Sequence, residues 1–219
     1  MASTIFVINP NSNEAVTAGI DAALEPLRIP GGPEIKSLTL KEGPLGVQTQ
    51  ADVESVTLPL AKLAQTLEAE AGAFVIACFS DPGMHLVRES VKQPVLGIAE
   101  CGILTALTLG QSFGVIAILD TSIPRHLRLW GAMGMTDRFA GEMAVGLSVA
   151  ELADRDRTLS RMLETGRRLR DERQAHVLVM GCAGMAAYRD HLEQALGIPV
   201  VEPTQAATTM ALGRVRLGW

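Results

Sequence analysis

The chain has 219 residues, of which 47% are hydrophobic and 4% are aromatic, and it carries a formal net charge of −5. A chain of this length buries most of the surface that its unfolded form exposes, so it needs no disulfide or metal to hold a fold. The acidic balance provides no basic field for phosphate backbones, which argues against nucleic-acid binding.

We expect neither a signal peptide nor a membrane span. The first residues contain no basic segment, and the longest apolar tract, residues 101–109, is much shorter than a transmembrane helix. The three cysteines include no close pair, which is typical of a reducing compartment. These features predict a cytoplasmic protein.

In the first half of the chain, short apolar runs of strand length alternate with longer helical patterns. The expected strands are residues 5–8, 34–40, 75–78 and 94–98. The expected helices are residues 14–27, 49–71, 85–92 and 102–109. Pro59 lies within the second of these helices and should kink or split it.

The same alternation follows in the second half. The expected strands are residues 113–119, 143–147, 177–180 and 198–201. The expected helices are residues 125–133, 149–172, 187–196 and 204–214. Alternating strands and helices predict an α/β fold with parallel sheets.

The two halves form an internal repeat. Cys182 follows Cys78 by 104 positions, and Pro199 follows Pro94 by 105. Each cysteine ends an apolar run and precedes small, turn-prone residues. Ligands of such folds bind beyond the carboxyl ends of the strands, so the turns at residues 9–13, 78–83, 120–122 and 182–184 should meet in a cleft between two pseudo-symmetric domains.

Two cysteines on opposite walls of one cleft suggest proton transfer at a carbon atom. The position of each thiol, between a strand end and a helix, should lower its pKa and favour the thiolate. One thiolate, Cys78 or Cys182, could then remove a proton while the other thiol protonates the opposite face. Cys101 lies in an apolar helix start and is interpreted as a core residue instead.

The turns also supply the expected substrate contacts. An enolate oxygen that develops during such a reaction needs fixed hydrogen-bond donors, which tight turns offer. The expected substrate-binding residues are Asn11, Phe79, Ser80, Thr121, Ser122, Ala183 and Gly184.

Other polar residues near the turns have simpler interpretations. Asn11 could cap the first helix as readily as contact a ligand, and Asn13 is interpreted as a cap. Asp81 fits turn chemistry, while Glu100 and Glu202 fit helix starts. The four histidines show no metal-ligand spacing and the chain has no glycine-rich nucleotide loop, so we expect neither metal nor cofactor.

Four motifs resemble the aspartate/glutamate/hydantoin racemase superfamily, and most closely its hydantoin and allantoin racemase branch. They are Ile-Asn-Pro-Asn-Ser at residues 8–12, Ala-Cys-Phe-Ser-Asp-Pro-Gly at 77–83, Gly-Ile-Ala-Glu at 97–100 and Gly-Cys-Ala-Gly-Met at 181–185. The resemblance implies two flavodoxin-like domains, residues 1–100 plus 205–219 and residues 101–204. It also implies cofactor-independent catalysis by Cys78 and Cys182, a small-molecule substrate and a homo-oligomer.

The residues after the first cysteine bear on the substrate. Amino-acid racemases of this superfamily place Asn-Thr there to hold a carboxylate, whereas this chain has Phe79 and Ser80. We therefore expect a racemase of a 5-substituted hydantoin or related cyclic ureide. The alternatives are an amino-acid racemase, a maleate-type cis-trans isomerase, and a metabolite-binding protein without turnover.

Overall fold

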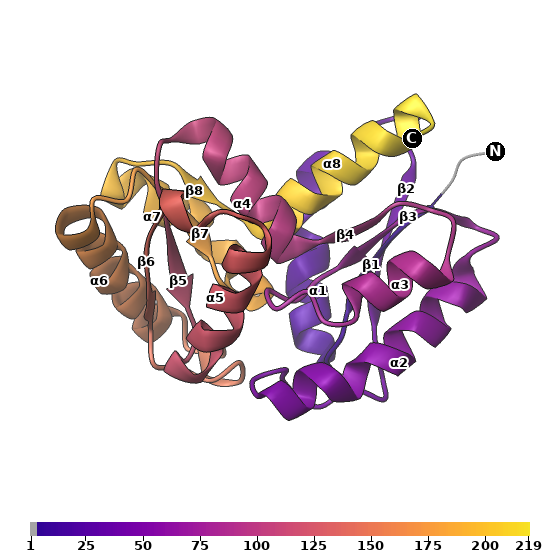
Figure 1. Cartoon of the computed structure of the whole chain (residues 1–219), viewed down its shortest axis with the longest axis horizontal. Coiled ribbons are helices and arrows are strands. Elements are labelled where there is room, and N and C mark those ends of the chain that lie inside the picture. The colour runs from indigo at the N-terminus through magenta and orange to yellow at the C-terminus, as the bar shows by residue number, and fades with distance from the viewer. Residues whose placement is uncertain (1–3) are drawn as a thin grey trace.

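A computed structural model describes residues 4–219. It contains two lobes, each built on a four-stranded parallel sheet (Figure 1). The strand orders are β2-β1-β3-β4 and β6-β5-β7-β8, so the second sheet repeats the order of the first. The strands are β1 (Thr4–Asn9), β2 (Glu34–Thr39), β3 (Ala71–Ile76), β4 (Val95–Gly97), β5 (Phe113–Ala117), β6 (Phe139–Ala144), β7 (Val177–Met180) and β8 (Val200–Val201). The predicted α/β class and the two flavodoxin-like domains are confirmed.

A helix follows each strand, as the βαβ arrangement requires. The helices are α1 (Glu14–Ala23), α2 (Gln50–Leu67), α3 (Met84–Ser90), α4 (Ile98–Leu109), α5 (Ile123–Ala132), α6 (Arg155–Arg173), α7 (Arg189–Leu196) and α8 (Pro203–Leu217). Short 3₁₀ turns lie among them, including Ala183–Tyr188 directly before α7.

Side-chain alternation along the central strands places helices on both faces of each sheet. In β1, Ile5 and Val7 enter the core between the lobes, whereas Phe6 and Ile8 face the layer that contains residues of α2 and α3. In β7, Val177 and Val179 likewise enter the core between the lobes. Strands buried on both faces are nearly continuous apolar runs, which is why the sequence revealed them so clearly.

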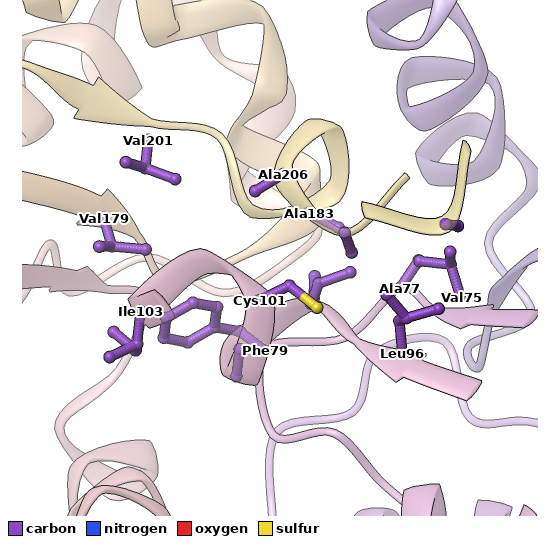
Figure 2. Packing of buried hydrophobic residues seen from close by; sticks show 14 of the residues in the cluster. Val75, Ala77, Phe79, Leu96, Cys101, Ile103, Val179, Ala183, Val201 and Ala206 are labelled. Atoms are coloured by element: carbon purple, nitrogen blue, oxygen red, sulfur yellow. The ribbon is translucent and has the colours of Figure 1, made fainter. Parts of the chain in front are cut away.

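One apolar cluster joins the lobes. Figure 2 shows Val75 and Leu96 of the first sheet and Val179 and Val201 of the second in the same cluster, with Cys101 of α4 among them. Cys101 is 2% exposed, as expected of a core residue. At about 25 cal/mol per Å², a core shared in this way opposes separation of the lobes.

The last helix of each half packs on the sheet of the other half. Helix α4 follows β4 of the first sheet but contacts β5, β7 and β8, whereas α8 follows β8 and contacts β1, β3 and β4. The two helices also pack on each other. These contacts support the proposed division into residues 1–100 plus 205–219 and residues 101–204.

Two predicted elements differ from the observed ones. Pro59 does not split α2, because Val56, Leu60 and Ala64 on both sides of it are buried in the same apolar layer, and that burial offsets the lost hydrogen bond. Strand β6 begins at Phe139 rather than Met143, and it contains Gly141 and Glu142, which are uncommon in strands.

Several other boundaries also differ from the predicted ones, including those of β3, which begins at Ala71 rather than Val75, and α4, which begins at Ile98 rather than Gly102. Helix α6 begins at Arg155 rather than near Val149, because the side chain of Asp154 accepts a hydrogen bond from the backbone N–H of Arg157. Helix α1 ends at Ala23, and the predicted remainder is a 3₁₀ turn that contains Pro26.

Candidate active site

The site lies beyond the carboxyl ends of the four central strands. After β3, the N–H of Ala77 still donates to the carbonyl of Ile8, so the chain turns at Cys78. After β7, the N–H of Gly181 donates to the carbonyl of Ile116, so the chain turns at Cys182. A Cβ on Gly181 would lie 2.7 Å from that carbonyl oxygen, so only glycine lets the strand approach so closely there.

Both cysteines line one cavity. The space enclosed by its lining is about 490 Å³ when the open mouth is included. Six of the seven expected substrate-binding residues line it, namely Asn11, Phe79, Ser80, Ser122, Ala183 and Gly184. Thr121 does not line the cavity. It is exposed, and its carbonyl accepts a hydrogen bond from Arg125.

The remaining lining is mostly apolar. Val16 comes from α1, Val47 from the loop before α2, Ile118 from the end of β5, and Val149 from the segment before α6. Four branched aliphatic side chains from separate segments give the cavity an apolar wall. Such a wall suits an uncharged ring or an aliphatic substituent.

The two thiols have raised pKa values, which corrects the expectation of lowered ones. Burial raises the pKa of Cys78 to about 12 and that of Cys182 to about 11. The backbone N–H groups of Ser80 and Gly184 oppose this increase, but the cost of desolvating a thiolate exceeds their contribution. The charge of Cys182 further raises the pKa of Cys78.

Asn11 lines the cavity and fixes the loop before α1, whereas the cap of that helix is Asn13. Oδ1 of Asn11 accepts from Asn9 Nδ2 at 3.0 Å and from the N–H of Asn13 at 3.0 Å, which fixes the loop. Asn13 itself caps α1 by accepting from the N–H of Ala15, as predicted. Among residues 4–219 no hydrogen bond uses Nδ2 of Asn11, so this group remains a free donor at the cavity.

Asp81 does more than shape its turn. Its carboxylate accepts from the N–H groups of Ala99 at 2.9 Å and Glu100 at 2.8 Å, so it caps α4 and ties the Cys78 loop to that helix. Burial raises the pKa of Asp81 to about 7. Glu100 lies in the first turn of α4 and pairs with Arg88, and Glu202 caps α8, so both fulfil the predicted role at helix starts.

The sequence reasoning missed three polar residues beside the cavity, namely Arg125, His126 and Glu142. Arg125 and His126 line it from the first turns of α5. Nδ1 of His126 lies 2.5 Å from Oε1 of Glu142, and its Nε2 lies 3.4 Å from Oγ of Ser80. The signal for the first two was their place just after the turn at residues 120–122, the counterpart of the loop at 9–13. Glu142 gave none, because it lies in the strand whose bounds were misplaced.

Arg125 joins the two lobes at the cavity. It donates to the carbonyl of Gln48 in the first lobe at 3.0 Å, and its Nε is buried without a hydrogen-bond partner. Burial lowers its pKa, and the charge of Cys78 opposes that effect. Arg125 in turn lowers the pKa of Cys78, so this cation favours the thiolate.

The described residues contain no set of side chains arranged to bind a metal ion. Within residues 4–219, no three His, Cys, Asp or Glu side chains are grouped so that they could hold a metal ion. Over the same residues, no helix is long and apolar enough to cross a membrane.

Comparisons with known proteins agree with this arrangement. The family model described as Asp/Glu/Hydantoin racemase matches residues 5–211. The hydantoin racemase of Paenarthrobacter aurescens is 32% identical over 219 residues, which cover 98% of this chain and 92% of that protein. The structure of allantoin racemase from Klebsiella pneumoniae has a TM-score of 0.94 at 28% identity, covering 99% of this chain and 89% of that one. Allantoin racemase from Pseudomonas fluorescens also gives 0.94 at 28% identity, with coverage of 98% and 92%.

Proposed function

The chain belongs to the Asp/Glu/Hydantoin racemase family, and on that premise we propose that it racemises a 5-substituted hydantoin or a related cyclic ureide. The family predicted from the four motifs is thereby confirmed, and its named relatives are isomerases. The proposed reaction uses Cys78 and Cys182 and needs no cofactor. A homo-oligomer and a cytoplasmic location remain predictions.

One observation carries the proposal. Cys78 and Cys182 occupy equivalent turns of the two half-repeats, and both line the same cavity. A reaction whose forward and reverse directions are mirror images needs an acid and a base on opposite faces of one carbon. A pseudo-symmetric pair of thiols supplies both.

In the proposed mechanism, the thiolate of one cysteine removes the proton from the carbon beside the ring carbonyl. The carbon–hydrogen electron pair moves into the ring to give an enolate, and the thiol of the other cysteine protonates the opposite face. The first cysteine then carries the proton, and the second is the thiolate. The free N–H donor of Asn11 and the cation of Arg125 are available to the enolate oxygen.

The substrate class rests on the lining of the cavity and on the names of relatives. The hydantoin racemase relatives include those of Paenarthrobacter aurescens and Rhizobium meliloti, each 32% identical to this chain. The four aliphatic side chains of the wall offer no partner for the ammonium group of a free amino acid. A neutral cyclic ureide therefore fits better than a free amino acid, whose ammonium group would have no partner there.

Solvent exchange tests the proposal. Either enantiomer of a 5-alkyl hydantoin, incubated in deuterium oxide, should lose optical rotation and gain deuterium at the stereogenic carbon. Cys78→Ser and Cys182→Ser should each abolish racemisation, and each should retain exchange from at most one enantiomer. Cys101→Ser serves as the matched control, because Cys101 lies in the core rather than at the cavity. Racemisation at the wild-type rate in both cavity variants would refute the two-cysteine mechanism.

The same substrate panel separates the alternatives. Turnover of aspartate or glutamate but not hydantoins would indicate an amino-acid racemase. A covalent substrate adduct on Cys78, detected by mass spectrometry, would indicate an isomerase of the maleate type. Binding without any solvent exchange would indicate a metabolite-binding protein.

A further inference from the structure

A chain of three polar side chains crosses from the second lobe to the first beside the cavity. It runs from Glu142 of β6 through His126 of α5 to Ser80, which follows Cys78 by two residues. The side chains of Glu142 and His126 are 0% and 3% exposed. The role proposed above for the two cysteines makes no use of this pair.

The pair is held rigidly by its surroundings. The ring of Phe79 meets that of His126 edge to face, with centroids 5.2 Å apart, and Trp130 packs against the imidazole from the same helix at 6.0 Å. Trp130 is fully buried. A histidine enclosed by two aromatic rings and a carboxylate has one orientation, so its two ring nitrogens have fixed partners.

The partners set the proton positions. A carboxylate only accepts hydrogen bonds, so Glu142 at 2.5 Å places the imidazole proton on Nδ1. In the neutral imidazole Nε2 then carries a lone pair, and at 3.4 Å it can accept the hydroxyl hydrogen of Ser80. The hydroxyl hydrogen thus points toward His126, and the remaining lone pairs of Oγ are left for the cavity that Ser80 lines.

We propose that Glu142 and His126 are positioning residues that hold the Ser80 hydroxyl as a hydrogen-bond acceptor for a substrate N–H beside the reacting carbon. The inference rests on the proposed function and narrows its substrate class to rings with N–H next to the stereogenic carbon, as in hydantoins. The backbone N–H of Ser80 remains a donor, and it is directed at the sulfur of Cys78.

Nuclear magnetic resonance of ¹⁵N-histidine-labelled protein tests the proton positions without any substrate. The other three histidines are exposed, so the buried ring of His126 should be distinguishable. We expect a proton on Nδ1 and none on Nε2 at neutral pH, and Glu142→Gln should disturb that pattern. A protonated Nε2 in the wild type would overturn the inference, whether or not the protein racemises hydantoins.

A pair of substrates tests the acceptor role. A 5-alkyl oxazolidine-2,4-dione has a ring oxygen where the hydantoin has the N–H beside the reacting carbon. The wild type should prefer the hydantoin in kcat/KM for solvent exchange by about 100-fold or more, because a lone pair of Ser80 would face a lone pair of the ring oxygen. Ser80→Ala should reduce that preference to below about tenfold. The two compounds differ in intrinsic acidity, but this difference is the same for every variant and cancels when the variants are compared.

His126→Phe and Glu142→Gln should move the preference in the same direction as Ser80→Ala, since each releases the hydroxyl. In the Ser80→Ala background neither should have a further effect on the preference. Ser112→Ala is the matched control, because its hydroxyl donates to the carbonyl of Gln174 far from the cavity. If His126→Phe fails to fold, Glu142→Gln provides the same comparison. An unchanged preference in Ser80→Ala would overturn the inference and leave the racemase proposal intact.

Discussion

Raising the pH should accelerate the proposed racemisation steeply across the neutral range. The base must be a thiolate, yet burial raises the pKa of Cys182 to about 11 and that of Cys78 to about 12. Since each unit below the pKa lowers the thiolate fraction tenfold, at pH 8 about one Cys182 in 1,000 and one Cys78 in 10,000 is ionised. The thiolate fraction, and with it kcat/KM, should therefore rise about tenfold per pH unit.

The measurement is kcat/KM for loss of optical rotation, from about pH 6.5 to about pH 8.5, where it should increase roughly 100-fold. Both enantiomers must give the same profile, because a racemisation has an equilibrium constant of one. That equality is an internal control on the two rate measurements. The ultraviolet absorbance of the thiolate, followed in a Cys101→Ser background, should show no ionisation of Cys78 or Cys182 over the same range. A plateau in kcat/KM below pH 8 would refute the argument from burial.

Three further predictions concern neighbours of the thiols. Arg125→Met should lower kcat/KM, because this substitution removes a cation that lowers the pKa of Cys78. Arg125→Lys keeps the positive charge and should recover part of the rate. An unchanged rate in Arg125→Met would contradict this prediction. Phe79→Ala should lower the urea-unfolding free energy by about 3–5 kcal/mol, because the ring is 3% exposed and packs on Trp130; a loss below about 1 kcal/mol would be inconsistent with that packing. Asp81, with a pKa raised by burial from 3.8 to about 7, favours the folded state when protonated. Asp81 therefore stabilises the fold by up to about 4 kcal/mol below about pH 4, and this stabilisation is lost as the pH rises through about 7. The unfolding free energy of Asp81→Asn should depend less on pH than that of the wild type.

The sequence determined the fold class and the positions of the two thiols. Parallel strands buried on both faces appear as continuous apolar runs, and a near-repeat of about a hundred residues fixed two equivalent halves. The carboxyl ends of such strands lie at one edge of a sheet, so Cys78 and Cys182 could be placed at the site from topology alone. The family motifs could be recognised for the same reason, since they lie in the turns that this topology brings together.

Only the tertiary structure decided the electrostatics and the polar contacts of the site. Local sequence suggested a lowered thiol pKa, because a helix start was the only visible influence, whereas burial by segments distant in the chain has the larger effect. Glu142 lies in an edge strand and meets His126 only because β6 pairs with β5 beneath α5. His126 reaches Ser80, 46 positions earlier, only because the two lobes share a core. Periodicity records which face of an element is buried, but it does not record which groups from other elements are buried against it.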